Sequence, residues 1–281
     1  DLHLSIRRQR QMCIRDRIIT MSKARELANL RGTPTDHNIL LQSTAGDAIT
    51  AGSGTYNFAA GLNAFGAGTT GDNNIAIGKT SLALATIGLN NIAIGELAMS
   101  GVTVEQADNN IAIGKSALVG TSDTTGDDNI AIGRSTMDAL TTGNCNIAMG
   151  HNSLGQSTIG SKNIAIGRTA MGACVVTGID NTAIANGALN SLTCGICNVA
   201  IGPNTLGQST TGCLNIAIGD LALGGAVTTG KCNIAIGTNA ADAITTGTYN
   251  TTIGVHAAVS YTHLRAHETL RYLVCRLLLE K

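Results

Sequence analysis

Asn129-Ile-Ala-Ile-Gly133 is one copy of a five-residue motif that returns every 17 to 19 residues along most of the chain. Clear copies begin at Asn74, Asn91, Asn110, Asn129, Asn146, Asn163, Asn198, Asn215 and Asn233, and degenerate copies begin at Asn57, Asn181 and Asn250. A fixed period of this length is typical of stacked supersecondary units, none of which buries a core alone. The motif therefore predicts a repetitive rod.

Several other positions of the repeat are also fixed, counting from its Asn as position 0. Gly occupies position +4 in every copy except one, where Ala185 replaces it, and Gly occupies −3 in every copy except one, where Ala107 replaces it. Position +7 is small and position +8 is apolar throughout. All variation in length falls between +8 and −3, so insertions are confined to one loop.

Within the motif, residues alternate in character with a period of two, which is typical of a β-strand. We expect the aliphatic residues at +1 and +3 to face the interior of a coil together with +8, and Asn and Ala to face the other way. Gly at +4 permits a tight turn with positive φ. The pair at +7 and +8 predicts a second short strand or a corner, and Thr-Thr-Gly, as in residues 141–143, closes the coil. The predicted fold is all-β, a parallel β-roll or β-solenoid.

The energetics of such a coil favour stacking and association. Three core side chains contribute roughly 1.5–3 kcal/mol each when buried, whereas ordering each residue costs about 1–2 kcal/mol. The small Ala at +2 predicts a smooth face for close packing against another chain, and successive Asn side chains predict hydrogen-bonded ladders. On this reasoning, Ile166→Asp disrupts the fold far more than Asp128→Ser.

The two ends of the chain differ from the repeat region in composition. Residues 1–17 and 259–281 hold nine of the 18 Lys and Arg residues and two of the eight Cys residues. Met12-Cys-Ile-Arg-Asp16 is encoded by ATG TGT ATA AGA GAC, which resembles the end of a transposon-based sequencing adaptor, and Val259 to Leu264 resembles the same end on the opposite strand. We therefore interpret both ends as translated library adaptor of a metagenomic fragment. The alternatives are a basic nucleic-acid arm at residues 5–17 and an amphipathic helix at 264–281.

Composition limits what the remaining residues can do. Without the ends the net charge is −5, which argues against nucleic-acid binding, because that needs a positive surface. No apolar run reaches the roughly 18 residues of a membrane helix. Few aromatic residues remain, so platforms for stacking sugars or bases are not expected.

No catalytic, cofactor-binding or metal-binding residues are expected from the sequence. Cys194 and Cys197 have redox or zinc-like spacing, but no matching second pair occurs. His37, His151 and His256 lack partners in register. The carboxylates of the turns are too few for calcium, so they are read as solvated side chains.

Residues 18–56 differ from the repeat and form a separate N-terminal segment. Ser22 is expected to cap a short helix from Lys23 to Leu30. Asn38-Ile-Leu-Leu41 lies 19 residues before Asn57 and predicts a degenerate first coil, because terminal repeats often cap a stack.

Residues 57–258, with Asn-Ile-Ala-Ile-Gly followed by Ala-Leu and Thr-Thr-Gly, resemble the repeats of phage tail fibres and related virion appendages. They are also similar to the head repeats of trimeric autotransporter adhesins. Residues 21–30 look like the start of some phage fibre proteins. The resemblance implies a homotrimeric structural fibre of the virion, without catalysis, that contacts other virion or tail proteins and reaches the host-cell surface through a tip missing after Ala258. Two alternatives stay open: a bacterial surface adhesin, and a single-chain ice-binding solenoid with rows of Thr.

Overall fold

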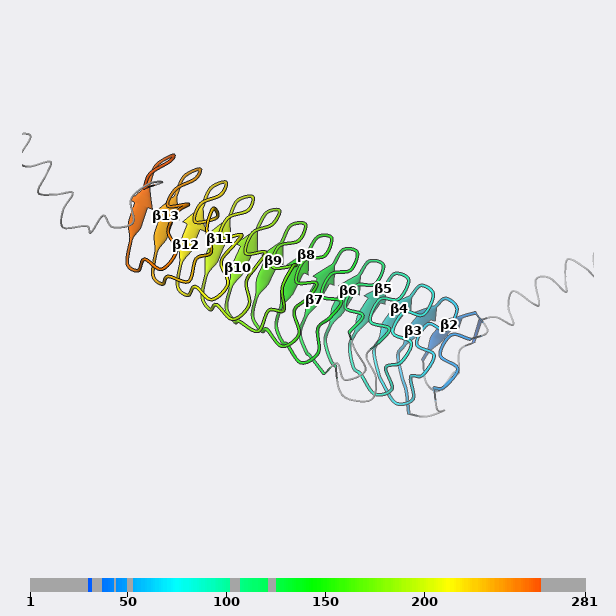
Figure 1. The fold of residues 1–281 in the computed structure, drawn as a ribbon. Helices are drawn as coiled ribbons and strands as arrows, with labels where there is room; N and C mark the ends of the chain where they lie inside the picture. The colour runs from blue at the N-terminus through cyan, green and yellow to red at the C-terminus, as the bar shows by residue number, and fades with distance from the viewer. Residues whose placement is uncertain are drawn as a thin grey trace, which may run out of the picture.

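A computed structural model describes residues 30–31, 37–42, 44–49, 53–101, 107–120 and 125–258. Both ends interpreted as adaptor lie outside the described residues, as do residues 22–29 of the expected helix. The described chain forms an elongated rod of stacked coils, with β2 near one end and β13 near the other (Figure 1). Twelve intervals between its thirteen parallel strands span about 58 Å at 4.8 Å each.

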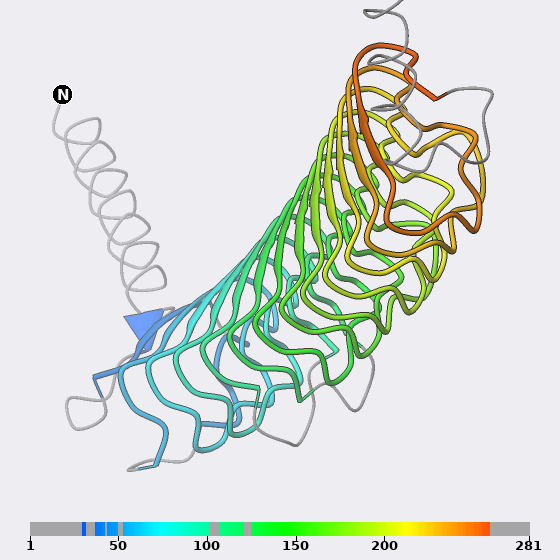
Figure 2. The ribbon, with the colours of Figure 1, turned by 90° about the vertical axis from the view of Figure 1, so that its left-hand side faces the viewer.

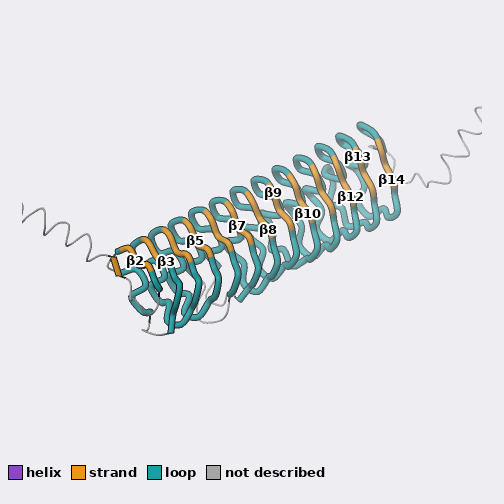
Figure 3. Tube along the Cα trace, turned by 180° about the vertical axis from the view of Figure 1, so that it is seen from behind, coloured by secondary structure: helices purple, strands orange, loops and turns teal. Residues whose placement is uncertain are grey.

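Each coil contributes one short strand to a single continuous sheet (Figure 3). The strands are β1 (Leu30–Arg31), β2 (Ile39–Leu41), β3 (Phe58–Ala60), β4 (Ile75–Ile77), β5 (Ile92–Ile94), β6 (Ile111–Ile113), β7 (Ile130–Ile132), β8 (Ile147–Met149), β9 (Ile164–Ile166), β10 (Thr182–Ile184), β11 (Val199–Ile201), β12 (Ile216–Ile218), β13 (Ile234–Ile236) and β14 (Thr251–Ile253). Strands β2 to β14 pair in chain order and in parallel, and equivalent repeat positions face each other, as Ala131 faces Ala148. The prediction of a parallel β-solenoid with one coil per repeat is confirmed.

The orientation expected for the strand was wrong. Ala at +2 is completely buried in eleven coils, from Ala59 to Ala235 and including Ala131, and Asn at position 0 is buried with it. The residues at +1 and +3 lie on the outer surface, where Ile77 is 37% and Ile166 is 36% exposed. A coil this thin has room for the smallest side chain and an amide, but not for two Ile side chains. The expected docking surface of Ala is therefore absent, because Ala faces inward.

The buried Asn side chains form a ladder along the rod, as the sequence predicted. The Asn146 Nδ2 donates to the Gly160 carbonyl at 2.8 Å and to the Asn129 Oδ1 at 3.1 Å. The Asn146 Oδ1 in turn accepts the backbone N–H of Asn163 at 3.0 Å. Each Asn thus closes its own coil and bonds both neighbouring coils, which satisfies backbone groups that are buried away from water.

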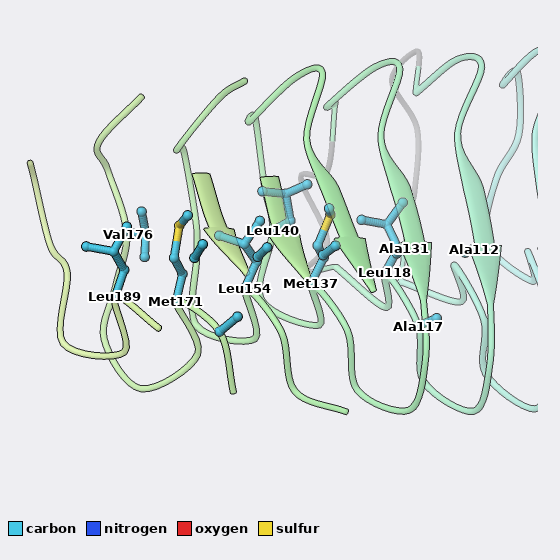
Figure 4. Close-up of a cluster of buried hydrophobic side chains, with 14 of the residues drawn as sticks. Ala112, Ala117, Leu118, Ala131, Met137, Leu140, Leu154, Met171, Val176 and Leu189 are labelled. Atoms are coloured by element: carbon cyan, nitrogen blue, oxygen red, sulfur yellow. The ribbon is translucent and has the colours of Figure 1, made fainter. Parts of the chain in front are cut away.

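The rest of the core comes from the small residues at +7, the apolar residues at +8 and a further position, +11, that the sequence did not reveal. Met137 and Leu140 occupy +8 and +11 in one coil and are both fully buried (Figure 4). The two positions are filled differently from coil to coil: Phe65 is followed by Gly68, where an added Cβ would clash with the Phe65 ring. At the other extreme, Ala241 is followed by Ile244. Close packing of this kind leaves little room for changes in volume.

The turns rely on left-handed backbone conformations at regular positions. Gly133 at +4 has a φ of 137°, and a Cβ there would lie 2.6 Å from the Gly150 carbonyl oxygen of the next coil. Non-glycine residues at −1, +6 and +8 also have positive φ, including Asp128 at 57° and Leu154 at 48°. The region of +7 and +8 is therefore a corner rather than a second strand. Figure 2 shows the stacked coils turning gradually along the rod, as expected for a twisted parallel sheet.

The N-terminal segment continues the stack by one coil. Asn57 donates its backbone N–H to the Asn38 Oδ1 at 2.7 Å, and Asn38 Nδ2 donates to the Gly54 carbonyl at 2.6 Å. Strand β1 pairs with β2 in the antiparallel direction, placing Leu30 opposite Leu41. The expected helix therefore does not extend to Leu30, which lies in a strand because it adds backbone hydrogen bonds to the sheet.

Candidate interaction face on the parallel sheet

The outer surface of the sheet is a continuous apolar face formed by positions +1 and +3, here called the Ile face. Its two rows comprise Ile75, Ile92, Ile111, Ile130, Ile147, Ile164, Thr182, Val199, Ile216 and Ile234 at +1, and Ile77, Ile94, Ile113, Ile132, Met149, Ile166, Ile184, Ile201, Ile218 and Ile236 at +3. Eight side chains of these two rows are at least 36% exposed, and so is Ile253, which extends the +3 row by one coil. A patch about 48 Å long and 10 Å wide covers roughly 480 Å², within the range of the largest patches on soluble monomers.

The buried side of each strand fixes which residues face outward. Asn163 and Ala165 are fully buried, so Ile164 and Ile166 between and beyond them must lie on the outside. A shift of register by one residue would bury both Ile side chains and expose the Asn ladder. No charged residue occurs at +1 or +3 in the twelve repeats, so the face carries no group suited to acid–base chemistry.

Charged side chains follow the edge of the sheet where each strand begins. Asp72 accepts the backbone N–H of Thr55 at 2.6 Å, and Asp127 accepts that of Asp108 at 2.8 Å. These carboxylates at −2 therefore bond the turn of the preceding coil. Asp128 at −1 is exposed.

The opposite edge, where each strand ends, carries Lys or Arg at +5 in four coils. The Lys115 Nζ lies 2.9 Å from the Glu96 Oε2 in the neighbouring coil. The hydrogen bond and charge of Lys115 lower the pKa of the Glu96 carboxyl. The Arg134 Nη2 lies 2.9 Å from the His151 Nε2 of the next coil.

The residues that carry catalytic or metal-binding potential are not brought together. His37 stacks on Tyr56 with ring centroids 4.9 Å apart, and His256 Nδ1 lies 3.5 Å from Asn239 Nδ2. Cys194 and Cys197 are free and exposed. Across the described ranges, no group of three or more His, Cys, Asp or Glu side chains is placed to hold a metal ion. That part of the chain also contains no helix long and apolar enough to cross a membrane.

The Thr pairs that motivated the ice-binding alternative divide between two environments. The Thr141 hydroxyl donates to the Thr158 carbonyl of the next coil at 2.9 Å, whereas Thr142 is exposed. The exposed row at −4 also contains Ile159 and Cys194, which interrupt the Thr side chains.

No protein-family model, curated protein or solved structure matches this chain. The Ile face was missed from sequence because large aliphatic residues with strand periodicity were assigned to the core. One signal pointed the other way: +2 is Ala in eleven of twelve copies, whereas +1 and +3 vary between Ile, Val, Met, Phe, Thr and Ala. Uniform small residues are what a thin, close-packed interior requires.

Proposed function

We propose that this chain is a shaft segment of a homotrimeric structural fibre of the phage tail-fibre type, in which the copies associate through their Ile faces. The observation that supports this proposal is the position of the Ile side chains of the strands, which lie on the outside of the rod in two rows. The resemblance of the repeat to those of phage tail fibres gives the class of fibre. The work of such a shaft is mechanical, to hold a tip at a distance from the virion.

The size of the Ile face limits how the copies can associate. The two rows alone cover about 480 Å², and roughly 960 Å² is available when both edges of the sheet are included. A trimer divides this area into two contacts of about 480 Å² each, below the roughly 800 Å² per partner of a standard interface, so both contacts together are needed to hold a copy. Because there are two parallel rows, each copy can offer the +1 row to one neighbour and the +3 row to another, which favours three chains around one axis.

The proposal is tested with the full chain by sedimentation equilibrium and electron microscopy. The wild-type chain is expected to form trimers that look like rods. The double variant Ile113→Asp and Ile166→Asp is expected to remain folded by circular dichroism but to sediment as a monomer, because both side chains lie on the face and burying a charge there is unfavourable.

A matched control is Ile159→Asp, which changes the same residue type at a 51% exposed position away from the sheet. It is expected to associate like the wild type. A wild-type chain that is monomeric at about 100 μM, well above the dissociation constants of stable interfaces, would contradict the proposal. So would equal association of the Ile113/Ile166 double variant and the wild type.

A further inference from the structure

Position +5, directly after the glycine that ends each strand, carries most of the positive charge of the repeat region. Residues 57–258 contain six Lys and Arg residues, and four of them lie at +5 within the six successive coils from β4 to β9. The +5 residues of these coils, here called the basic row, are Lys79, Glu96, Lys115, Arg134, His151 and Arg168. The Lys, Arg and Glu residues give this row a net positive charge, although the repeat region as a whole is acidic, with eleven Asp and Glu residues.

The backbone fixes the spacing of the basic row. The carbonyl of each +5 residue accepts the N–H at +6 of the next coil, as the Lys115 carbonyl accepts the Ser135 N–H at 3.0 Å. Successive members therefore follow the rise of the coils, about 4.8 Å, and the row from Lys79 to Arg168 spans about 24 Å. All six residues are exposed. The row is thus an extended line of mostly positive charge that solvent and ligands can reach.

The chain itself neutralises little of this charge. Lys115 pairs with Glu96 at 2.9 Å, but no carboxylate of the described residues forms an ion pair with Lys79, Arg134 or Arg168. The Arg134 Nη2 instead donates to the His151 Nε2 at 2.9 Å, because a guanidinium group has no acceptor. Like charges on neighbouring coils repel each other, and an anionic ligand that spans them removes that repulsion.

Uncharged polar side chains accompany the basic row at the next position, +6. Five of the six coils carry a hydroxyl or amide group there, in Thr80, Ser116, Ser135, Asn152 and Thr169. Hydroxyl and amide groups can both donate and accept hydrogen bonds. The two positions together offer regular positive charge and neutral hydrogen-bonding groups, which suits a ligand that is both anionic and rich in hydroxyl groups.

This combination distinguishes between two classes of polyanion. An extended acidic polysaccharide carries carboxylate or sulfate groups at intervals set by its sugar rings, with hydroxyl groups between them. Single-stranded nucleic acid also carries regular charge, but its binding sites add aromatic side chains on which the bases stack. No aromatic residue occurs between residues 66 and 248, a range that includes the whole basic row. The observations therefore favour the polysaccharide.

We propose that the basic row binds an acidic polysaccharide that lies along the side of the rod, with anionic groups against Lys79, Arg134 and Arg168. The two Arg side chains suit this role, because a guanidinium group binds a carboxylate or a sulfate through two parallel hydrogen bonds. The binding surface belongs to the side of the rod and needs neither a tip nor association of copies. Its test is therefore independent of the fibre proposal.

Binding is measured with the full chain by fluorescence anisotropy of a labelled oligogalacturonate of twelve sugar units in 50 mM salt. The row variant carries Lys79→Gln, Arg134→Gln and Arg168→Gln. It keeps the ion pair between Lys115 and Glu96, and the three replaced side chains are exposed, so the fold is expected to be unchanged. Circular dichroism verifies the fold of each variant.

A control variant with Arg10→Gln, Lys162→Gln and Lys231→Gln loses the same charge at positions outside the row. The dissociation constant is expected to rise at least about ten-fold for the row variant and less than about three-fold for the control, because regular contacts rather than net charge determine binding. Raising the salt concentration is expected to weaken binding of the wild type more steeply than that of the row variant, since fewer counterions are released when contacts are lost. Equal dissociation constants for the row variant and the control would overturn the proposal.

A gain of affinity provides the converse test. Asn186 is exposed at +5 of the next coil, that of β10, so Asn186→Lys extends the row. This variant is expected to bind the oligogalacturonate at least about two-fold more tightly than the wild type. The matched control Gln156→Lys adds the same charge at an exposed +10 position and is expected to change affinity less. A larger gain from Gln156→Lys than from Asn186→Lys would contradict binding along the row.

A series of probes identifies the class of ligand. Oligogalacturonate presents carboxylates, dextran sulfate presents sulfates, and tighter binding of either one names the anionic group that the row prefers. Neutral dextran is expected not to bind. Single-stranded oligothymidylate of twelve nucleotides is expected to bind more weakly than both acidic saccharides. Tighter binding of the oligothymidylate, or comparable binding of neutral dextran, would overturn the assignment to an acidic polysaccharide.

Discussion

Replacing Asn146 by Ala tests whether the Asn ladder holds the coils together. The substitution removes the Nδ2 that donates to the Gly160 carbonyl at 2.8 Å and to the Asn129 Oδ1 at 3.1 Å. It also removes the Oδ1 that accepts the Asn163 N–H at 3.0 Å. The backbone N–H of residue 146 still donates to the Asn129 Oδ1, so two groups are left without their partner: the carbonyl of Gly160 and the N–H of Asn163.

The expected cost follows from those two groups. Each buried polar group without a partner costs about 1–3 kcal/mol, so the free energy of unfolding is expected to fall by about 2–6 kcal/mol. Asn163 is completely buried, which leaves little access for a replacing water. Because neighbouring coils share the ladder, the largest loss of local stability is expected in the coils on either side of residue 146.

The assay is urea unfolding followed by circular dichroism, with amide hydrogen exchange to locate the weakened coils. Asn144→Ala is the matched control, because Asn144 is exposed and its Oδ1 accepts one N–H, that of Asp127 at 2.9 Å, which water can replace. Its cost is expected to stay below about 1 kcal/mol. If the two substitutions shift the unfolding midpoint equally, the ladder does not stabilise the stack as argued here.

Three further predictions concern the turns, the core and pH. Ala185→Gly is expected to raise stability by about 1 kcal/mol in urea unfolding, because φ is 118° where other coils have Gly, whereas Gly133→Ala is expected to destabilise. Ala241→Leu is expected to cost about 1–3 kcal/mol through overpacking, and adding Ile244→Ala is expected to recover part of that loss in a double-mutant cycle. Burial raises the pKa of the Asp138 carboxyl, so the unfolded chain ionises at lower pH than the folded one. The wild-type free energy of unfolding is therefore expected to fall as the pH rises from the pKa of Asp138 in the unfolded chain to its higher pKa in the folded chain. The variant Asp138→Ala is expected to have a higher melting temperature than the wild type at pH 7 but not at pH 3.

The fold was predictable because the repeat carries three independent signals. Its period indicated stacked coils, Gly at +4 indicated a turn with positive φ, and the recurring Asn indicated a ladder between coils. All three depend on local geometry that recurs twelve times, so no long-range information was required. The apolar character of +8 likewise placed Leu154 and its equivalents in the core.

The orientation of the strand was not predictable from alternation alone. A period of two divides a strand into two faces, but it does not say which face is inside. The rule that large aliphatic residues lie inside failed because the coil is too thin to hold Ile164 and Ile166. Position +11 was missed because it has no fixed residue type: it ranges from Gly68 through Ser157 to Leu140.

This inversion also changes what the substitution Ile166→Asp is expected to do. If Ile166 were in the core, the charge would unfold the chain. Because Ile166 is 36% exposed, an isolated copy can keep a carboxylate there in contact with water, and the cost appears when a second copy covers the face. Under the proposed association, the strand separates stability from association. Asn and Ala hold the stack together from within, while the Ile rows on the outside face the other copies.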